Sequence, residues 1–301
     1  MKSPVFSKSK ASIVIVGCGF LGKATAQLFS EQGYRVTSIV RSESSREELL
    51  KEHLPFDIVL CDVTNKEAVK KIEPQLQEAS LMIYAVSSGR GDAETYAAVY
   101  RDGLKNVLAT WQPAHLIFVS STSVYAQTEG AVVTESSKAK PDRATSRVLL
   151  EAEDIALTAG GNAARFAGIY GPGRSVLLKK FLNNEARLEE GGHRWINQIH
   201  RDDGARALYH LGTSSAPAGI YNVADDTPAT QRDVYQWMSD YLQQPLPPSG
   251  PADLNRKRGW TSKRISNKKL RDTGWSPQFP SYKEALPMLL EAEGERLKAK
   301  G

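Results

Sequence analysis

An apolar run that ends in three closely spaced glycines constrains the fold of this chain more than any other feature. The run SIVIV begins at Ser12, and Gly17, Gly19 and Gly22 follow it as G-x-G-x-x-G at the start of a segment with helical periodicity. In this order the glycines permit a tight turn, close approach of the backbone to a pyrophosphate, and close packing of a helix on a strand. Unpaired N–H groups at the helix N-terminus then favour an anion. The residues expected to bind a dinucleotide here are Gly17, Cys18, Gly19, Phe20, Leu21 and Gly22.

Short β-branched runs alternate with amphipathic segments along the first half of the chain, which is typical of a parallel sheet with helices on both faces. The expected strands are residues 12–16, 35–40, 58–61, 81–84, 115–120, 163–169 and 220–223. The expected helices are residues 20–32, 66–75, 93–110, 142–158 and 230–242, with two more near Asn267 and Ser281. We therefore predict an α/β fold with a doubly wound parallel sheet, helices on both of its faces and a smaller C-terminal lobe.

The pattern changes after the sixth expected strand, which indicates how the chain is divided. A chain of 301 residues is long enough for one large domain or two smaller ones. We predict a flexible extension over residues 1–10 and a dinucleotide-binding domain over 11–170, to which a strand at 219–225 returns. Residues 171–218 and 226–301 are expected to form a substrate-binding lobe.

Charge and cysteine content exclude several classes of function. The formal net charge of +5 is mild, and basic residues are mixed with acidic ones along the chain, which favours a small anionic ligand and indicates no nucleic-acid partner. Cys18 and Cys61 are the only cysteines and neither stands in a CxxC or His-rich pattern, so we expect no metal and a reducing, cytoplasmic setting. No run of about 18 apolar residues occurs, so we expect no membrane partner.

The residues after the second expected strand indicate which dinucleotide binds. Arg41 and Ser42 stand where NAD-binding chains usually carry an aspartate or glutamate for the ribose 2′-hydroxyl. A cation with an adjacent hydroxyl suits a 2′-phosphate, so NADP is the expected cofactor and NAD the less favoured one. Two alternatives stay open: Arg41 is a solvated residue at a strand end, or Arg46 is the phosphate partner.

Further cofactor contacts are expected at the carboxyl ends of the third and fourth strands, where ligands collect in such sheets. Asp62 stands where it can accept a hydrogen bond from an adenine amino group, and the alternative is a turn aspartate that caps the next helix. Cys18 is expected to be a small packing residue, and the alternative is a thiolate whose oxidation would obstruct the phosphates. The strand-end residues expected to contact the cofactor are Asp62, Val63, Ala85, Val86 and Ser87.

Four further segments follow the glycine loop, and their order along the chain is specific. They are FVSSTSVYA from Phe118, ARFAGIYGPGR from Ala164, INQIHRDD from Ile196 and YNVADD from Tyr221. Together with GCGFLG they make the chain resemble an extended short-chain dehydrogenase/reductase of the NAD-dependent epimerase/dehydratase type, over nearly its whole length. The resemblance implies a Rossmann domain, a C-terminal substrate lobe, nucleotide sugars as the commonest substrates and, often, a homodimer. One departure is visible, because Val16 stands at the first glycine of the family's usual G-x-x-G-x-x-G.

The family implied by this resemblance uses a serine or threonine at the end of the fifth strand, a Tyr-x-x-x-Lys pair on the next helix and an asparagine on the preceding one. Matching FVSSTSVYA to this pattern gives the serine role to Ser121, with Thr122 and Ser120 as neighbours able to share it. The same match puts Thr145 at the tyrosine position and Leu149 at the lysine position. The chain therefore resembles an atypical branch of the family, in which the fold persists without the usual catalytic set.

The missing pair changes the chemistry that the resemblance implies. A tyrosine with a pKa of about 10 is ionised only to about one part in a thousand at pH 7, a cost of roughly 4 kcal/mol that a neighbouring cation normally offsets. Another acid or base is needed, and the candidates are Tyr170 at the end of the sixth strand, Tyr100 at the family's asparagine position, and Tyr125. Each of the three has a packing role as its alternative.

Substrate contacts are expected near the strand ends and in the C-terminal lobe, from Ser88, Thr122, Arg174 and His200. For His200 the favoured alternative is a hydrogen-bonded structural role beside Asp202 and Asp203. Arg165 and the basic segment 255–264 are further candidates for an anionic substrate, because arginine suits bidentate phosphate contacts. A solvated surface is the alternative for the basic segment.

These observations predict an NADP-binding protein with a small-molecule substrate, such as a nucleotide sugar. The leading prediction is an oxidoreductase, or a nucleotide-sugar epimerase/dehydratase-like enzyme, that uses Ser121 with Tyr170 or Tyr100 in a non-standard active site. The alternative is a catalytically silent NADP(H)-binding sensor or regulatory protein.

Overall fold

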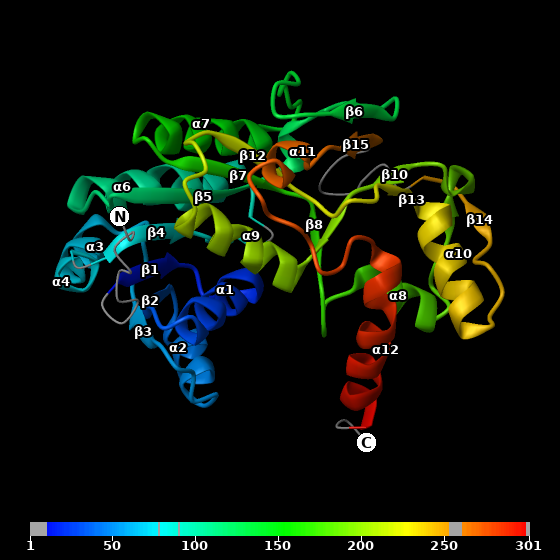
Figure 1. The fold of residues 1–301 in the computed structure, drawn as a ribbon, viewed down its shortest axis with the longest axis horizontal. Coiled ribbons are helices and arrows are strands. Elements are labelled where there is room, and N and C mark those ends of the chain that lie inside the picture. The colour runs from blue at the N-terminus through cyan, green and yellow to red at the C-terminus, as the bar shows by residue number, and fades with distance from the viewer. Residues whose placement is uncertain (1–10, 78, 90, 253–260, 299–301) are drawn as a thin grey trace, which may run out of the picture. The chain divides into compact units, whose positions relative to one another are not determined.

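The computed structural model describes residues 11–77, 79–89, 91–252 and 261–298, which form two compact units (Figure 1). Unit 1 comprises the described residues of Met1–Val124, Asp142–Arg165 and Ala205–Ile220. Unit 2 comprises those of Tyr125–Pro141, Phe166–Gly204 and Tyr221–Gly301.

A seven-stranded sheet has the strand order β12-β7-β5-β4-β1-β2-β3. Each adjacent pair from β5 to β3 is parallel, and β1 lies between β2 and β4. The strands are β1 (Ser12–Val16), β2 (Arg35–Val40), β3 (Asp57–Leu60), β4 (Ala79–Tyr84), β5 (His115–Ser121), β7 (Asn162–Phe166) and β12 (Ile220–Val223). This sheet confirms the predicted Rossmann-type α/β fold.

Helices cover both faces of the sheet in unit 1. In Figure 1, α6 (Gly103–Thr110) and α7 (Ala144–Thr158) lie on one side, and α1 (Phe20–Glu31) and α9 (Arg201–Thr213) lie on the other. The α1 helix packs on α9 through Phe29, whose ring centre is 5.0 Å from that of Tyr209. Every residue of β1 is buried, as expected for a central strand with helices on both faces.

Most strands lie within two residues of their predicted bounds, and β1, β2 and β12 match them. The expected strand 163–169 is different, because it is interrupted at Ala167. The Ala167 N–H donates to the carbonyl of Val223 at 2.9 Å, and β8 (Gly168–Tyr170) then pairs in parallel with β11 (Gln198–His200). The apolar pattern continues through this change of partner, so the sequence does not reveal it.

Two predicted helices are divided. The helix expected over 66–75 consists of α3 (Lys66–Lys71) and α4 (Glu73–Leu76), because Pro74 in the first turn of α4 has no N–H to continue an earlier helix. The helix expected over 93–110 consists of α5 (Ala93–Tyr96), a π-helical turn η2 (Ala97–Asp102) and α6.

Three helices have no predicted counterpart: α2 (Glu43–Leu50), α8 (Val176–Leu182) and α9. The α2 helix buries only Leu49, so it lacks the apolar stripe by which a surface helix is recognised. In α9, Gly204 and Gly212 lower the helical propensity of the segment.

Unit 2 contains short strand pairs and helices around its own core. The pairs are β6 (Ala131–Val133) with β15 (Lys263–Ile265), β10 (Trp195–Ile196) with β13 (Ala229–Thr230), and β9 (Leu188–Glu189) with β14 (Ser249–Gly250). Its helices include α10 (Gln231–Leu242), α11 (Lys268–Arg271) and α12 (Tyr282–Lys298). Thr230 and Asp233 form a capping box that begins α10 one residue after the predicted start. The core of unit 2 contains Tyr170, Phe181 and Tyr235.

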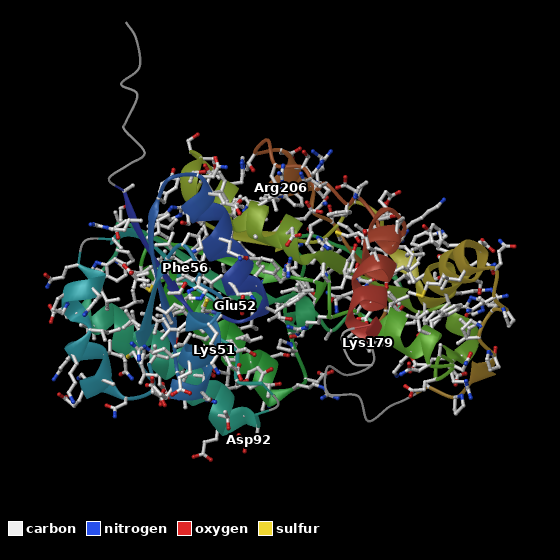
Figure 2. All side chains as sticks on the ribbon, turned by 90° about the horizontal axis from the view of Figure 1, so that it is seen from below. Lys51, Glu52, Phe56, Asp92, Lys179 and Arg206 are labelled. Atoms are coloured by element: carbon white, nitrogen blue, oxygen red, sulfur yellow. The ribbon has the colours of Figure 1, made fainter. Side chains whose placement is uncertain are left out.

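Charged side chains lie at the surface of unit 1. Figure 2 shows Lys51 and Glu52 after α2, and Asp92, which caps α5 by accepting the N–H of Thr95. Glu52 forms an ion pair with Lys23 at 2.8 Å. Among the described residues, no helix has the length and apolar character to cross a membrane, and no cluster of His, Cys, Asp or Glu is arranged to hold a metal.

Arg165, a candidate for binding an anionic substrate, lies in the interior of unit 1 with 3% of its surface exposed. Its Nη2 is 2.6 Å from Oε2 of Glu153, and Oε1 of the same carboxylate accepts the Ser120 hydroxyl. Glu153 neutralises the buried guanidinium. Because Arg165 belongs to β7 and Glu153 to α7, the ion pair also links these two elements.

Removing one charge of this buried pair is expected to cost about 3–5 kcal/mol of unfolding free energy, because the partner charge stays buried. Glu153→Gln keeps the shape of the side chain and removes its charge. The matched change at the exposed ion pair of Glu67 with Lys70, Glu67→Gln, is expected to have no measurable effect. Urea denaturation measures both variants, and equal effects would contradict a stabilising role for Glu153.

Candidate functional site

The glycine loop after β1 owes its shape to close backbone contacts. Gly17 has a φ of +105°, and a Cβ there would lie 2.6 Å from the carbonyl oxygen of Ala85. A Cβ at Gly22 would lie 1.9 Å from the carbonyl oxygen of Gly17, whereas one at Gly19 would meet nothing within 4 Å. None of the described side chains caps the N-terminus of α1. The loop therefore leaves open space in front of helix N–H groups that can bind an anion.

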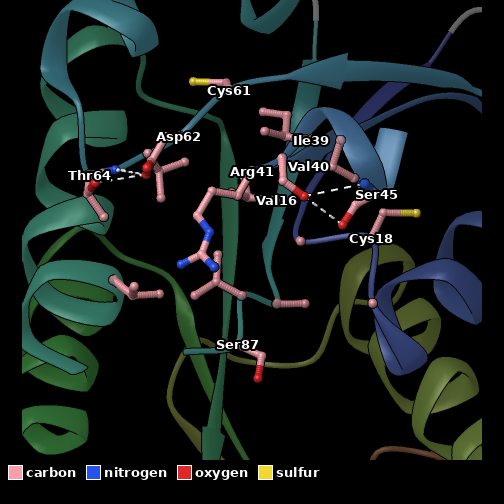
Figure 3. Close-up of a pocket in the computed structure, with 17 residues that line it drawn as sticks. Val16, Cys18, Ile39, Val40, Arg41, Ser45, Cys61, Asp62, Thr64 and Ser87 are labelled. Carbon is pink, nitrogen blue, oxygen red and sulfur yellow. Dashed lines mark hydrogen bonds between the residues drawn. The ribbon is translucent and has the colours of Figure 1, made fainter. Parts of the chain in front are cut away.

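This loop forms one wall of a cavity of about 240 Å³ in unit 1, and the ends of β2, β3 and β4 form others (Figure 3). The predicted cofactor residues on the wall are Gly17, Cys18, Gly19, Arg41, Ser42, Asp62, Val63, Ala85, Val86 and Ser87. The predicted residues Phe20, Leu21 and Gly22 lie in the first turn of α1 and do not line it.

Seven wall residues were absent from the prediction: Val16, Ile39, Val40, Ser45, Cys61, Thr64 and Val99. Val16 and Val40 end their strands, and Cys61 follows its strand directly. These three residues were predictable, because ligands collect at the carboxyl ends of the strands and the last residue of each strand could have been included. Ser45 and Val99 belong to helical turns, and nothing in the local pattern places those turns at the cavity.

Arg41 follows β2 and is exposed. Figure 3 shows its side chain between the Asp62–Thr64 turn and Ser87, and within the described part of the chain it makes no ion pair or hydrogen bond. Arg46, the alternative phosphate partner, has its Nη1 2.9 Å from Oε1 of Glu43 and does not line the cavity. Of the two arginines, Arg41 is the one that faces the cavity.

The polar side chains beside Arg41 also hold local turns. The Ser42 hydroxyl accepts the N–H of Ser45 at 3.3 Å and caps α2. Oδ1 of Asp62 accepts the N–H of Thr64 at 2.9 Å and the Thr64 hydroxyl at 2.8 Å, so Asp62 holds a turn. The helix-capping part of its alternative role is wrong, because Asn65 caps α3. Asp62 therefore holds its own turn and lines the cavity at the same time.

Both cysteines lie on the cavity wall and are buried. Burial raises the pKa of the Cys18 thiol, against an opposing interaction with Ser38. Burial also raises the pKa of Cys61 to about 11. Both thiols are therefore protonated at neutral pH, which favours the packing role for Cys18 over a reactive thiolate.

Ser121 ends β5, and its Oγ accepts the N–H of Ser123 at 3.2 Å. Thr122 begins the 3-10 turn η3 (Thr122–Val124) and is 8% exposed. The hydroxyl of Ser120 donates to Glu153. Of the three neighbouring hydroxyls, Ser120 is thus engaged in the buried ion-pair network of unit 1.

The α7 helix carries the positions matched to the family's tyrosine and lysine. These positions hold Thr145 and Leu149, and the helix sequence contains neither tyrosine nor lysine. Leu149 is buried, with 4% of its surface exposed. At this position the helix therefore contributes packing.

Tyr100 lies in η2 and does not line the cavity. Burial raises the pKa of Tyr100, and Ser88 and Ser87 oppose this shift. Its ring centre is 4.9 Å from that of Tyr96 and 6.4 Å from that of Phe118. Tyr100 is therefore a phenol at neutral pH, and its raised pKa makes it a weaker acid than an exposed tyrosine.

Tyr170 and His200 lie in the interior of unit 2, with ring centres 5.4 Å apart. Burial, followed by the charge of Asp225, raises the pKa of Tyr170. His200 Nδ1 accepts the N–H of Asp202 at 3.3 Å, and burial lowers the pKa of His200 to about 4. Both side chains are uncharged at neutral pH, and the His200 contact is the hydrogen-bonded structural arrangement given as its alternative.

Two other candidates lie in unit 2. The Tyr125 hydroxyl donates to Oδ1 of Asn222 at 3.0 Å and is fully buried. Arg174 is exposed, and its backbone closes a turn with Gly171 through hydrogen bonds of 2.9 and 3.1 Å.

Most of the basic segment 255–264 lies outside the described residues. In its described part, Lys263 is buried and donates to the carbonyl of Tyr125 at 2.8 Å. Arg264 donates to the carbonyl of Gly130 at 2.9 Å and lies over the ring of Trp195. Both cations therefore hold together parts of unit 2.

A comparison with protein-family models shows which family the chain belongs to. The model of the NAD dependent epimerase/dehydratase family matches residues 13–224. The chain belongs to this family. The matched part includes the glycine loop, every residue on the cavity wall and Ser121. A comparison with curated proteins finds no match.

Solved structures share the fold of this family member. A protein from Methylobacillus flagellatus, assigned as an NAD-dependent epimerase/dehydratase, is 28% identical over 95% of this chain and 99% of that one, with a TM-score of 0.76. WbmG of Bordetella bronchiseptica, solved in complex with NAD, is 15% identical over 97% and 96%, with a TM-score of 0.82. MoeE5, solved with UDP-glucose and NAD, is 18% identical over 95% and 100%, with a TM-score of 0.77.

A side chain at Gly22 is expected to destabilise unit 1, because its Cβ would overlap the Gly17 carbonyl oxygen. Overpacking of this kind costs about 1–3 kcal/mol, so Gly22→Ala should unfold at a clearly lower temperature than the parent. Gly19→Ala is the matched control, since its Cβ enters open space at an ordinary φ of −85°. Thermal unfolding of the two variants tests this, and an unchanged Gly22→Ala would contradict the close contact.

His200 is expected to make the unfolding free energy depend on pH. Its pKa of about 4 in the folded state lies below the ordinary value of about 6.5, so the folded protein binds fewer protons between these values. Stability should therefore fall by about 3 kcal/mol as the pH drops through this window. His200→Gln is expected to flatten the profile and the exposed His193→Gln to leave it unchanged, as measured by urea unfolding from pH 7 to pH 4. A profile that His200→Gln leaves unaltered would contradict the shift.

Proposed function

We propose that the cavity of unit 1 binds a nicotinamide adenine dinucleotide and that the preferred form is NADP. The observation that carries the proposal is the glycine loop, which opens onto a cavity beside an uncapped helix N-terminus. The pyrophosphate would lie against Gly17, Gly19 and the first turn of α1, where N–H groups favour an anion. The strand-end residues Asp62 and Ser87, which are expected to contact the cofactor, line the same cavity.

Arg41 supports the choice of NADP over NAD. It is the residue after β2, it lines the cavity beside the hydroxyls of Ser42 and Ser45, and a guanidinium suits a 2′-phosphate. The one carboxylate near the start of α2, Glu43, is paired with Arg46. The NAD in the WbmG and MoeE5 structures favours the other form, although those proteins are 15% and 18% identical to this chain.

The activity proposed for this site is that of an oxidoreductase, or of an epimerase/dehydratase acting on a nucleotide sugar. The bound cofactor would supply the hydride acceptor or donor. Tyr100 would be the proton donor, since burial keeps it as a phenol at neutral pH. Ser121 would offer a second hydroxyl. UDP-glucose in MoeE5 and UDP in WbmG support a nucleotide sugar as the substrate class.

A catalytically silent NADP(H) sensor is the second candidate function. It is favoured by α7, which has no Tyr-x-x-x-Lys pair. It is also favoured by Tyr170 and His200. Burial raises the pKa of Tyr170 and lowers that of His200, so neither side chain exchanges protons readily near pH 7. In this reading the dinucleotide binds tightly and no substrate is turned over.

Calorimetric titration with NADP and with NAD tests the cofactor proposal. Arg41→Ala is expected to weaken NADP binding by about 10- to 100-fold, because a charge-assisted contact is worth about 1.5–3 kcal/mol, and to leave NAD binding unchanged. Arg46→Ala is the matched control and should leave both affinities unchanged. Tighter binding of NAD than of NADP by the parent protein would contradict the role of Arg41.

Steady-state oxidation of NADPH over a panel of carbonyl compounds and nucleotide sugars separates the enzyme from the sensor. If the protein turns over, Tyr100→Phe should lower kcat by about 100-fold, the effect of losing a general acid, while the affinity for NADP is kept. Ser121→Ala tests the second hydroxyl in the same assay. Tight binding without turnover across the panel would exclude the enzyme and favour the sensor.

A homodimer and a cytoplasmic location belong to the same proposal, on the resemblance to the family and on the cysteine content. Light scattering on the purified protein measures its mass in solution, and a monomer at all concentrations would contradict the dimer.

A further inference from the structure

The Tyr84 hydroxyl takes the place of a backbone hydrogen bond in the helix that follows β4. Tyr84 is the last residue of β4 and is fully buried, and its Oη donates to the carbonyl of Val99 at 2.7 Å. In an α-helix this carbonyl would accept the N–H of Gly103, four residues later. Here the Gly103 N–H donates to Ala98, five residues earlier, so the turn is π-helical.

Gly103 matches this arrangement. A Cβ at this position would lie 2.6 Å from the Tyr84 hydroxyl oxygen and 2.9 Å from Cγ2 of Val63. A residue other than glycine would therefore displace either the hydroxyl or the helix. Tyr84 and Gly103 form a complementary pair, one supplying the hydrogen bond and the other leaving room for it.

The π-helical turn decides which side chains reach the cavity. Each residue of an α-helix turns the chain by about 100°, so one additional residue in a turn rotates everything before it relative to α6. In the π form, Val99 lies on the cavity wall. Closure of η2 to an α-helix would turn Val99 away from this position.

Tyr84 also adjoins the glycine loop through the chain. The next residue, Ala85, donates its N–H to the carbonyl of Val16 at 2.8 Å, and its own carbonyl lies against Gly17. The end of β4 is therefore in contact with the glycine loop through its backbone and with η2 through the Tyr84 hydroxyl.

We propose that Tyr84 is a positioning residue for the dinucleotide site: its hydroxyl holds η2 in the π form and so places Val99 at the cavity wall. This rests on the proposed binding of NADP in the same cavity.

The decisive variant is Tyr84→Phe, with Tyr282→Phe as the matched control. Tyr282 is also fully buried and loses one hydrogen bond, to Ser175 in unit 2. Tyr84→Phe is expected to weaken NADP binding by about three- to tenfold, the effect of one lost hydrogen bond. A merely structural role of the hydroxyl would lower the unfolding temperature and leave the NADP affinity unchanged. Tyr282→Phe should not change the NADP affinity.

A crystal structure of ligand-free Tyr84→Phe supplies a readout that does not depend on the cofactor. We expect the Gly103 N–H to pair with the Val99 carbonyl in this variant. A retained π turn together with unchanged NADP affinity would overturn the role of Tyr84 alone. A parent protein that does not bind NADP would overturn the cofactor site and the positioning role, while the structure of the variant would still show whether the hydroxyl holds the turn.

Gly103→Ala tests the same pair from the other side and serves if Tyr84→Phe does not fold. Its Cβ would displace the Tyr84 hydroxyl, so it should lower the unfolding temperature and weaken NADP binding. In the double variant Tyr84→Phe/Gly103→Ala the steric conflict with the hydroxyl is gone, so its loss of stability should be smaller than the sum of the two single losses. Strict additivity would contradict the pairing.

Discussion

Close contact between two backbones, the loop after β1 and the end of β4, determines where the other parts of the cavity lie. The Gly17 N–H donates to Ile39 on one side, and Ala85 donates to Val16 on the other. These bonds hold the ends of β2 and β4 beside the loop, and a side chain at Gly17 would separate them. The cavity forms where β1, β2 and β4 end around the loop of residues 17–19, in which two of the three residues are glycine.

The predicted bounds of β1, β2 and β12 match the structure. Every residue of β1 is buried, and so is every residue of β2 except Arg35, because helices cover both faces of a central parallel strand. The break between β7 and β8 was not predictable, since it depends on a change of hydrogen-bond partner at Ala167, and the side-chain pattern runs on without interruption.

The same distinction holds for the site. The glycine loop, Arg41 and Ser87 were predictable because chain order alone puts them at strand ends. Ser45 and Val99 were not, because they reach the cavity through helices whose positions depend on tertiary packing. The π turn that presents Val99 depends on a hydroxyl that lies 15 residues earlier in the chain, and a contact of that kind leaves no local signal.

Two helices begin at the wall of one cavity. The α1 helix starts behind Gly19, and α2 starts behind Ser42, so the partial positive charges of two helix N-termini lie at one cavity. The cavity is electropositive at two separate points before the charge of any side chain is added. A ligand that carries two phosphate centres on one framework matches this charge distribution better than a ligand that carries one.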